Sequence, residues 1–300
     1  MHWERYIKDF VSYLKIEKGL AENSILAYQR DVSLLADYFT TEKSKPEQIS
    51  YEQLKTFVAY LYDLGLSARS QARIISGIKQ FFRYLILERY IHVDPSELLE
   101  QPKLGRKLPE VLEIEEIDAL LAAIDLSAAE GERNHAMLET LYSCGLRVSE
   151  LVGLRFSDLY FDEGFIRVIG KGNKERLVPV SPQVVQEITT YTAQSRLEVP
   201  IKKGHEHFIF LNRRGAALTR VMIFTIIKQL AQKIGLGKQI SPHTFRHSFA
   251  THLVEGGANL RAVQEMLGHE SITTTEIYTH LDQRFLRKAI LSHHPRNQGK

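Results

Sequence analysis

Cysteine is nearly missing from this chain of 300 residues, which contains one, and it has no long apolar run. A single cysteine, Cys144, excludes an internal disulfide and is typical of proteins from a reducing compartment. No stretch approaches the ~18 consecutive apolar residues of a membrane span. The N-terminal residues Met1–Tyr6 carry charges where a signal peptide needs apolar side chains. We therefore expect a cytoplasmic protein.

Charge of one sign is also scarce, since the formal net charge is only +3. This small excess permits a nucleic-acid-binding surface but does not require one. With 44% hydrophobic and 25% charged residues, the composition is that of an ordinary globular protein. The length suggests two domains. Evidence for a function must therefore come from motifs.

Residues 1–100 carry the apolar spacing of four amphipathic helices. Ser50 and Ser67 precede two of these stripes and are predicted N-caps, and Gly65 is predicted to end a helix between them. A different composition follows, because residues 101–109 combine two prolines, a glycine and basic side chains. This segment reads as a linker, and both a solvated connector and a contact with a phosphate backbone fit its charge.

Residues 110–300 predict a mostly helical domain with one small antiparallel sheet. Residues 165–169 and 176–180 read as strands of a hairpin whose turn begins at Gly170, and residues 208–211 as a third strand. The remaining pattern predicts helices at about 113–124, 133–144, 182–197, 219–234, 242–255, 260–267, 271–279 and 283–291. The fold class is therefore mainly α, with an all-helical first domain.

A set of polar residues in this second part offers the groups that cleave a phosphodiester without a metal. Such a reaction needs a nucleophile, an acceptor for its proton, positive charge on the non-bridging oxygens and a proton for the leaving oxygen. The candidates are Arg147, Lys171, His243, Arg246, His269 and Tyr278.

Local sequence supports part of this set. Gly145 suits a helix end, so Arg147 begins the next short helix. Ser241 followed by proline predicts a helix start, which places His243 in the first turn with Arg246 on the same face. Arginine suits a phosphate because its planar fork contacts two oxygens and stays charged.

These residues, in this order, resemble the catalytic set of the tyrosine recombinases, the phage integrase family. The flanking segments "GLRVSELVGL", "VIGKGNKERLVPV", "SPHTFRHSFATHL" and "LGHESITTTEIYTHLD" resemble the bacterial Xer recombinases, and the XerD branch more than the XerC branch. The resemblance extends from about residue 3 to residue 295. It implies a four-helix SAM-like core-binding domain at 1–100 and a catalytic domain at 110–300.

The resemblance also implies a role for each candidate. Among the 13 tyrosines it selects Tyr278 as the nucleophile that forms a 3′-phosphotyrosyl bond and leaves a free 5′-hydroxyl. A phenol with a pKa near 10 is scarcely ionised at neutral pH, so it needs a proton acceptor, for which His243 is the candidate. His269 is expected to hydrogen-bond the scissile phosphate. The family pattern assigns Lys171 as the general acid, with Lys174 as a phosphate contact.

A metal site is the alternative interpretation of the histidines. His243 and His247 have the i, i+4 spacing that can bind zinc, but no cysteine or carboxylate nearby completes a set. Because one phosphoester replaces another in the reaction that the resemblance implies, no ATP is needed to reseal the strand. We therefore expect neither a metal nor a cofactor.

Double-stranded DNA is the expected partner. Arg220 opens a predicted helix and could reach base edges in the major groove, with Lys228 as a phosphate contact. Arg69, Arg73 and Lys79 lie along one helix of the first domain, where a solvated face is an equal alternative. The resemblance suggests that the two domains clamp a duplex. Binding should then weaken steeply with salt.

The resemblance further implies a biological role and protein partners. Family members resolve chromosome dimers at a dedicated dif-like site before cell division. They commonly act in a heterotetramer with a XerC-like partner recombinase, and a septal DNA translocase activates them. The segment 283–294 could pack on its own domain or dock into a neighbouring protomer. Rival interpretations are a mobile-element integrase or resolvase, a topoisomerase IB-like activity, and a sequence-specific DNA-binding protein without catalysis.

Overall fold

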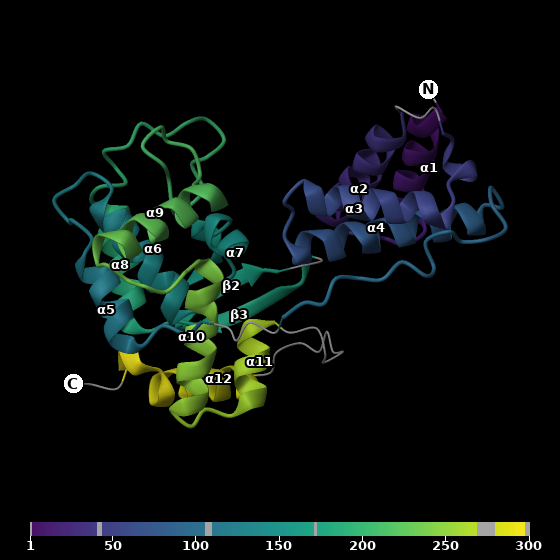
Figure 1. The fold of residues 1–300 in the computed structure, drawn as a ribbon. Coiled ribbons are helices and arrows are strands. Elements are labelled where there is room, and N and C mark those ends of the chain that lie inside the picture. The colour runs from purple at the N-terminus through teal and green to yellow at the C-terminus, as the bar shows by residue number, and fades with distance from the viewer. Residues whose placement is uncertain (1, 41–43, 106–109, 171–172, 269–279, 298–300) are drawn as a thin grey trace. The chain divides into compact units, whose positions relative to one another are not determined.

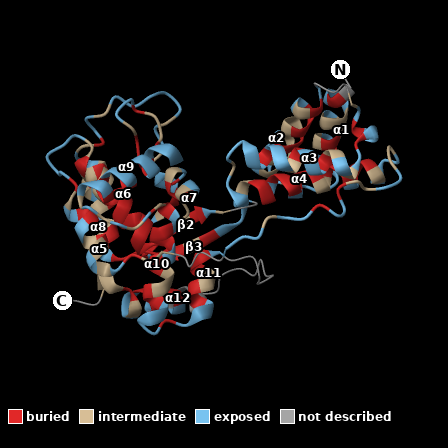
Figure 2. Ribbon diagram, viewed as in Figure 1, coloured by how far each residue is buried: buried red, intermediate tan, exposed pale blue. Residues whose placement is uncertain are grey.

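The computed structural model describes residues 2–40, 44–105, 110–170, 173–268 and 280–297. The chain forms two compact units, residues 1–107 and 108–300 (Figure 1). The division falls within residues 101–109, whose composition is that of a linker. Each unit has its own apolar core, visible as the buried interior in Figure 2.

The N-terminal unit is all-helical, as predicted. Ser50 accepts a hydrogen bond from the backbone N–H of Gln53, and Ser67 accepts one from Ser70, so both predicted N-caps are confirmed. Buried aromatic side chains, among them Phe10, fill the space between the helices. Its elements are α1 (His2–Ile16), α2 (Glu22–Thr40), η1 (Pro46–Gln48), α3 (Tyr51–Asp63) and α4 (Ala68–Leu87).

The C-terminal unit is mostly helical and contains a three-stranded antiparallel sheet in the order β1-β2-β3. The predicted hairpin is confirmed as β2 and β3, with Val168 paired to Arg176. The strands are β1 (Leu159–Tyr160), β2 (Phe165–Ile169) and β3 (Glu175–Pro179). The helices are α5 (Ile114–Ala122), α6 (Gly131–Ser143), α7 (Val148–Val152), α8 (Pro182–Ala193), α9 (Arg220–Lys233), α10 (Pro242–Glu255), α11 (Leu260–Leu267) and α12 (His280–His293), with short 3-10 turns η2 (Phe156–Asp158) and η4 (Pro295–Asn297). The predicted helix at 271–279 lies outside the described residues.

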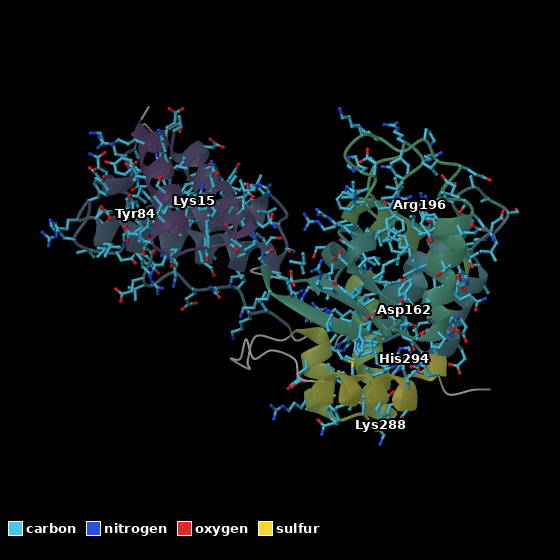
Figure 3. All side chains as sticks on the ribbon, turned by 180° about the vertical axis from the view of Figure 1, so that it is seen from behind. Lys15, Tyr84, Asp162, Arg196, Lys288 and His294 are labelled. Atoms are coloured by element: carbon cyan, nitrogen blue, oxygen red, sulfur yellow. The ribbon has the colours of Figure 1, made fainter. Side chains whose placement is uncertain are left out.

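The predicted strand at residues 208–211 is wrong. Phe208 and Leu211 form only isolated bridges, and the third strand is β1 instead. The buried guanidinium of Arg196, labelled in Figure 3, donates hydrogen bonds to the carbonyls of Glu206, Phe208 and Ile209. The carbonyls of Phe208 and Ile209 thus bind a side chain in place of a neighbouring strand.

The apolar spacing of α9 predicts that Val221, Ile223, Phe224, Ile227 and Leu230 all pack inward, and this prediction is partly wrong. Val221 and Phe224 are 75% and 48% exposed, whereas Ile223 and Ile227 are fully buried. Ile223 and Ile227 are separated by four positions and lie on the inner face, whereas Val221 and Phe224 point to solvent. The outer face of α9 is therefore more apolar than expected.

The last helix, α12, packs on its own unit, against α10, α11 and β3 (Figure 1). Just beyond it, Arg296 forms ion pairs with Glu139 (Nε to Oε1, 3.2 Å) and with Asp118, and its guanidinium lies over the ring of Tyr142. His294, labelled in Figure 3, is fully buried beside the same ring. The C-terminal segment is thus held within one chain.

No helix in the part of the chain that the structure describes combines the length and apolar character needed to cross a membrane.

Replacing Arg296 by methionine should destabilise the C-terminal unit. Glu139 is 0% exposed and would be left without its cationic partner. Breaking such a buried pair costs roughly 3–5 kcal/mol. Urea unfolding followed by circular dichroism measures the loss. The double variant Arg296→Met/Glu139→Gln should recover much of it, because no uncompensated charge stays buried. An unchanged unfolding curve for Arg296→Met would contradict the predicted anchor.

Candidate active site

The structure places three of the six candidate catalytic residues. Arg147 and Arg246 lie close together in the C-terminal unit, where both approach the same buried carboxylate. His243 is exposed in the first turn of α10, one turn before Arg246. Lys171, His269 and Tyr278 lie outside the described residues.

Arg147 is positioned by the turn between α6 and α7. Gly145 has a positive φ of 56°, which ends α6 as predicted and turns the chain back. The backbone N–H of Arg147 donates to Glu150 Oε2 (2.8 Å), and its Nη1 donates to Oε1 (2.8 Å). Its Nη2 donates to the carbonyl of Gly268 at 3.2 Å. The side chain keeps 31% of its surface exposed, so an incoming anion can reach it.

Arg246 extends from α10, which begins at Pro242 after the N-cap Ser241, as predicted. Its Nη1 donates to the carbonyl of Gly145 at 2.7 Å, and its Nη2 donates to the carbonyl of Leu267. Burial, together with the neighbouring charges of Arg147 and Arg176, lowers the pKa of Arg246 to about 9. The guanidinium is therefore still protonated at neutral pH.

Two residues that were not predicted from the sequence, Glu150 and Arg176, hold this site together. Arg176 on β3 forms a bidentate ion pair with Glu150: its Nη1 donates to Oε1 (2.7 Å) and its Nη2 donates to Oε2 (2.8 Å). Both residues are only 5% exposed. Two sequence signals were available: Glu150 lies three positions after Arg147, the capping-box spacing, and Arg176 alternates with the buried Val178 on an inward strand position.

Three arginines also secure the end of α11. Arg176 Nε donates to the carbonyl of Met266 (2.7 Å), while Arg246 and Arg147 donate to the next two carbonyls, those of Leu267 and Gly268. The last carbonyls of a helix have no partner within the helix and carry its negative end of the dipole, so cations stabilise them. Residue 269 follows this end directly.

Glu150 compensates the charges of the cluster. Burial by itself raises its pKa, but the hydrogen bonds and charge of Arg176, with those from Arg147, lower the pKa from 4.5 to about 2. The carboxylate is thus ionised at neutral pH. Three guanidiniums around one carboxylate leave a local excess of positive charge, which is suited to an anion with more than one negative charge.

The predicted DNA contacts in the C-terminal unit lie at the surface. Arg220 and Lys228 are exposed on α9, and Lys174 is exposed beside the hairpin turn. The backbone carbonyl of Lys174 accepts a hydrogen bond from Gly170 (2.8 Å), which closes the turn.

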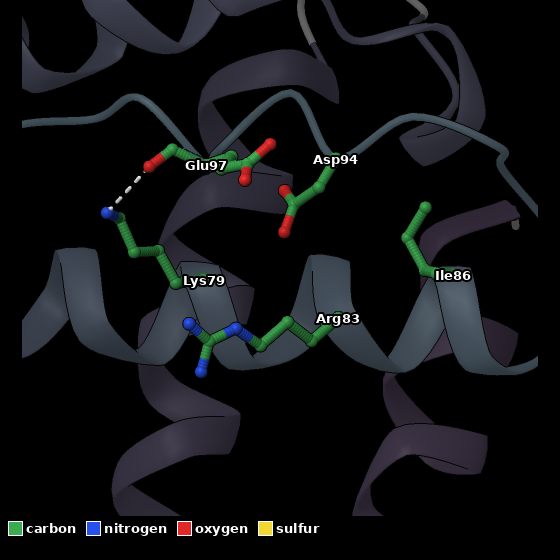
Figure 4. Close-up of a pocket in the computed structure, with 5 residues that line it drawn as sticks. All are labelled: Lys79, Arg83, Ile86, Asp94 and Glu97. Carbon is green, nitrogen blue, oxygen red and sulfur yellow. Dashed lines mark hydrogen bonds between the residues drawn. The ribbon is translucent and has the colours of Figure 1, made fainter.

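In the N-terminal unit the three predicted contacts lie along α4. Arg69 is exposed, and Arg73 pairs with the buried Asp31 (Nη1 to Oδ1, 2.6 Å) while keeping 52% of its side chain exposed. Lys79 donates to the carbonyl of Glu97 at 3.1 Å, across a shallow pocket that Arg83 also lines (Figure 4). Arg73 is therefore held in place, whereas Lys79 is partly engaged with its own chain.

The residues that the structure describes include no group of three His, Cys, Asp or Glu side chains that could hold a metal ion. His243 and His247 are both exposed on α10.

Comparison with known proteins covers both units. Residues 110–284 match the model of the phage integrase family, and residues 7–89 match that of the phage integrase N-terminal SAM-like domain. The chain is 44% identical over 291 residues to a tyrosine recombinase XerD of Staphylococcus epidermidis, covering 97% of this chain and 98% of that protein. It is also 44% identical over 294 residues to a tyrosine recombinase XerD of Staphylococcus aureus, covering 98% and 99%.

A solved structure is similar over most of the chain. It is the XerH site-specific recombinase bound to a palindromic difH substrate in a post-cleavage complex, with a TM-score of 0.70 and 26% identity. The alignment covers 95% of this chain and 84% of that one.

The acid stability of the C-terminal unit should depend on Glu150. Its pKa is about 2 in the folded state against an ordinary 4.5, so the stabilisation is complete above about pH 4.5 and is lost as the pH falls towards 2. The difference in melting temperature between wild type and Glu150→Gln should therefore be largest above pH 4.5 and should narrow below it.

Thermal unfolding at a series of pH values measures this difference. Glu175→Gln is the matched control. The Glu175 carboxylate is 53% exposed and its ion pair with Arg167 is long (3.8 Å), so this pair contributes little to stability. A Glu150→Gln difference that stayed constant from pH 7 down to the lowest pH at which the protein folds would contradict the assignment.

Proposed function

We propose a reaction mechanism from the premise that the chain belongs to the phage integrase family and is a site-specific tyrosine recombinase of the Xer type. We infer that its substrate is double-stranded DNA, because the related XerH structure holds a DNA substrate named difH. The proposed target is a dif-like recombination site.

Tyr278 is the proposed nucleophile. Its phenolic oxygen attacks the scissile phosphorus, a bond forms between phosphorus and this oxygen, and the bond from phosphorus to the 5′ oxygen breaks. His243 accepts the phenolic proton, and Lys171 gives a proton to the leaving 5′ oxygen. The products are a 3′-phosphotyrosyl adduct and a free 5′-hydroxyl. Attack by a 5′-hydroxyl of another strand reverses the step and rejoins the DNA without a cofactor.

The arginine cluster is the observation that carries this proposal. Attack on a phosphodiester converts one negative charge into two at the pentavalent phosphorus. Both Nη atoms of Arg147 and of Arg246 are anchored, and the N–H groups that these bonds leave over are proposed to bind such an anion. Together with Arg176 and less the charge of Glu150, the cluster carries a formal charge of about +2 that matches this state. His269 is proposed to hydrogen-bond the same phosphate.

The exposed cations supply the proposed grip on DNA. Arg220 at the start of α9 reaches base edges in the major groove. Lys228, further along the same helix, contacts a phosphate. Lys174 contacts the phosphate backbone near the hairpin turn. In the N-terminal unit, the helix that carries Arg69 and Arg73 contributes phosphate contacts, with Lys79 joining them when it leaves Glu97.

The proposed biological role is the resolution of chromosome dimers during chromosome partition and cell division. In this role the protein works in the cytoplasm, in a heterotetramer with a XerC-like partner recombinase, and a septal DNA translocase activates it. The XerD relatives, matched over nearly their whole length, favour this role over that of a mobile-element integrase or resolvase.

Removing the nucleophile tests the mechanism. We expect wild type to form a covalent protein–DNA adduct on a labelled duplex that carries the host's chromosome-terminus site, nicked near the cleavage point so that the cut fragment escapes. Tyr278→Phe should bind the site with unchanged affinity and form no adduct, because no oxygen is left to attack. The assay is run in EDTA and read on a denaturing gel.

Four outcomes would contradict the proposal. Adduct formation by Tyr278→Phe would exclude this tyrosine, and a requirement for a divalent metal would exclude the mechanism. Specific binding without any adduct, even after addition of the XerC-like partner, would favour a DNA-binding protein without catalysis. Relaxation of supercoiled plasmids that lack the site would favour the topoisomerase IB-like activity.

The α9 contacts should separate into specific and non-specific classes. Arg220→Ala should cost roughly 1–3 kcal/mol of binding and relax base preference at one position of the site, whereas Lys228→Ala should weaken all sequences and reduce the salt slope by about 1. Fluorescence anisotropy at several salt concentrations measures both effects. Lys233→Ala is the control on the same helix, because its Nζ already donates to the carbonyl of Ala123. Equal losses on specific and unrelated DNA for Arg220→Ala would rule out base recognition.

A further inference from the structure

We propose that Arg176 is a positioning residue for the reaction, which fixes Glu150 and the end of α11 so that Arg147 meets the scissile phosphate in one orientation. The proposal rests on the function proposed above and adds a residue that does not touch the substrate. In the sequence, Arg176 is marked by its inward strand position beside Val178, and it carries none of the reacting groups.

Arg176 connects three elements of the C-terminal unit through one side chain. It begins on β3, binds both oxygens of Glu150 on α7, and donates from Nε to the carbonyl of Met266 on α11. A Cβ placed on Gly268 would lie 3.2 Å from Arg176 Cδ, so the side chain also packs against the left-handed turn that ends α11. β3, α7 and α11 are therefore held at fixed distances around a single guanidinium.

Arg147 depends on this arrangement. Its Nη1 and its backbone N–H both bind Glu150, and each Glu150 oxygen also accepts from Arg176. A carboxylate with one partner can rotate, but the two parallel bonds from Arg176 fix the plane of Glu150. The orientation of the Arg147 fork is thereby set before a phosphate arrives, and pre-set geometry of this kind lowers the barrier to reaction.

A direct contact between Arg176 and the phosphate is the competing interpretation. Arg176 is 5% exposed, and its Nε and both Nη atoms already have partners at 2.7–2.8 Å. Arg147 differs in that its side chain is 31% exposed and one Nη binds only a single carbonyl at 3.2 Å. The two arginines therefore have different roles: Arg147 reaches the anion, and Arg176 stays with Glu150 and Met266.

Lysine cannot replace Arg176 in this role. A single ammonium keeps the charge but cannot bind both oxygens of Glu150 in parallel and the carbonyl of Met266 at the same time. Arg176→Lys therefore removes the orientation while leaving the buried Glu150 with a cation nearby. Arg167→Lys is the matched control. Arg167 lies on the adjacent strand β2 and pairs through Nη2 with Asp158 Oδ1 (2.8 Å), not with Glu150.

The experiment compares two scissile groups in the nicked duplex, an ordinary phosphate and a methylphosphonate, in which an uncharged methyl replaces one non-bridging oxygen. On the ordinary phosphate, Arg176→Lys should form the adduct about 10²-fold more slowly than wild type, the size expected for a misplaced group remote from the chemistry. Affinity for the site should stay unchanged. On the methylphosphonate the loss should be at least about tenfold smaller, because less charge needs stabilising. Arg147→Ala should show the same dependence.

Three results would overturn the proposal. The first is a wild-type rate for Arg176→Lys on the ordinary phosphate, and the second is an equal loss on both scissile groups, which indicates a purely structural role. The third is a loss of the same size for Arg167→Lys. Adduct formation by Tyr278→Phe in parallel identifies failure of the proposed function itself, so the two failures are distinguishable.

A double-variant comparison keeps the test valid if Arg176→Lys folds poorly. Arg176→Met/Glu150→Gln removes both charges of the buried pair, so no uncompensated ion is left in the interior. Because Arg176 acts largely through Glu150, the further loss of this double variant relative to Glu150→Gln alone should be much smaller than the about 10²-fold expected for Arg176→Lys. Losses that multiply would show that the two residues act independently and would contradict the proposal.

Discussion

The site depends on one buried carboxylate. Glu150 lies among Arg147, Arg176 and Arg246, and without its charge three guanidiniums would have to be held together in a region that little water reaches. Like charges at such distances repel strongly where the dielectric is low. The carboxylate removes part of this repulsion yet leaves a positive excess. The cluster is therefore stable in the free protein and still able to bind an anion.

The same cluster joins elements that are far apart in the chain. The guanidiniums bind the carbonyls of Met266, Leu267 and Gly268 at the end of α11, and Arg246 also binds the carbonyl of Gly145 at the end of α6. Ends of helices carry unpaired carbonyls, so they are natural partners for cations. A second charged group anchors the segment after α12, where Arg296 pairs with Glu139 on α6 and with Asp118 on α5.

Local patterns predicted much of the fold. Apolar spacing and N-cap residues gave the helices of both units, and the glycine-rich turn gave the hairpin of β2 and β3. The errors arose where long-range contacts outweigh local preference. Residues 208–211 have strand character, but Arg196 occupies their carbonyls, and on α9 Val221 and Phe224 are apolar yet lie on the solvent side.

For the site, the sequence by itself determined which groups are present and their order: two arginines, two histidines, a lysine and a tyrosine, in segments that resemble one family. These depend on residue type and spacing, which the sequence carries directly. The capping-box spacing connects Glu150 with Arg147 locally, but only the tertiary structure decided that Arg176 joins them. Arg176 is 26 residues from Glu150 and 90 from Met266, and contacts at such separation arise from the packing of β3 against α7 and α11, which no local pattern encodes.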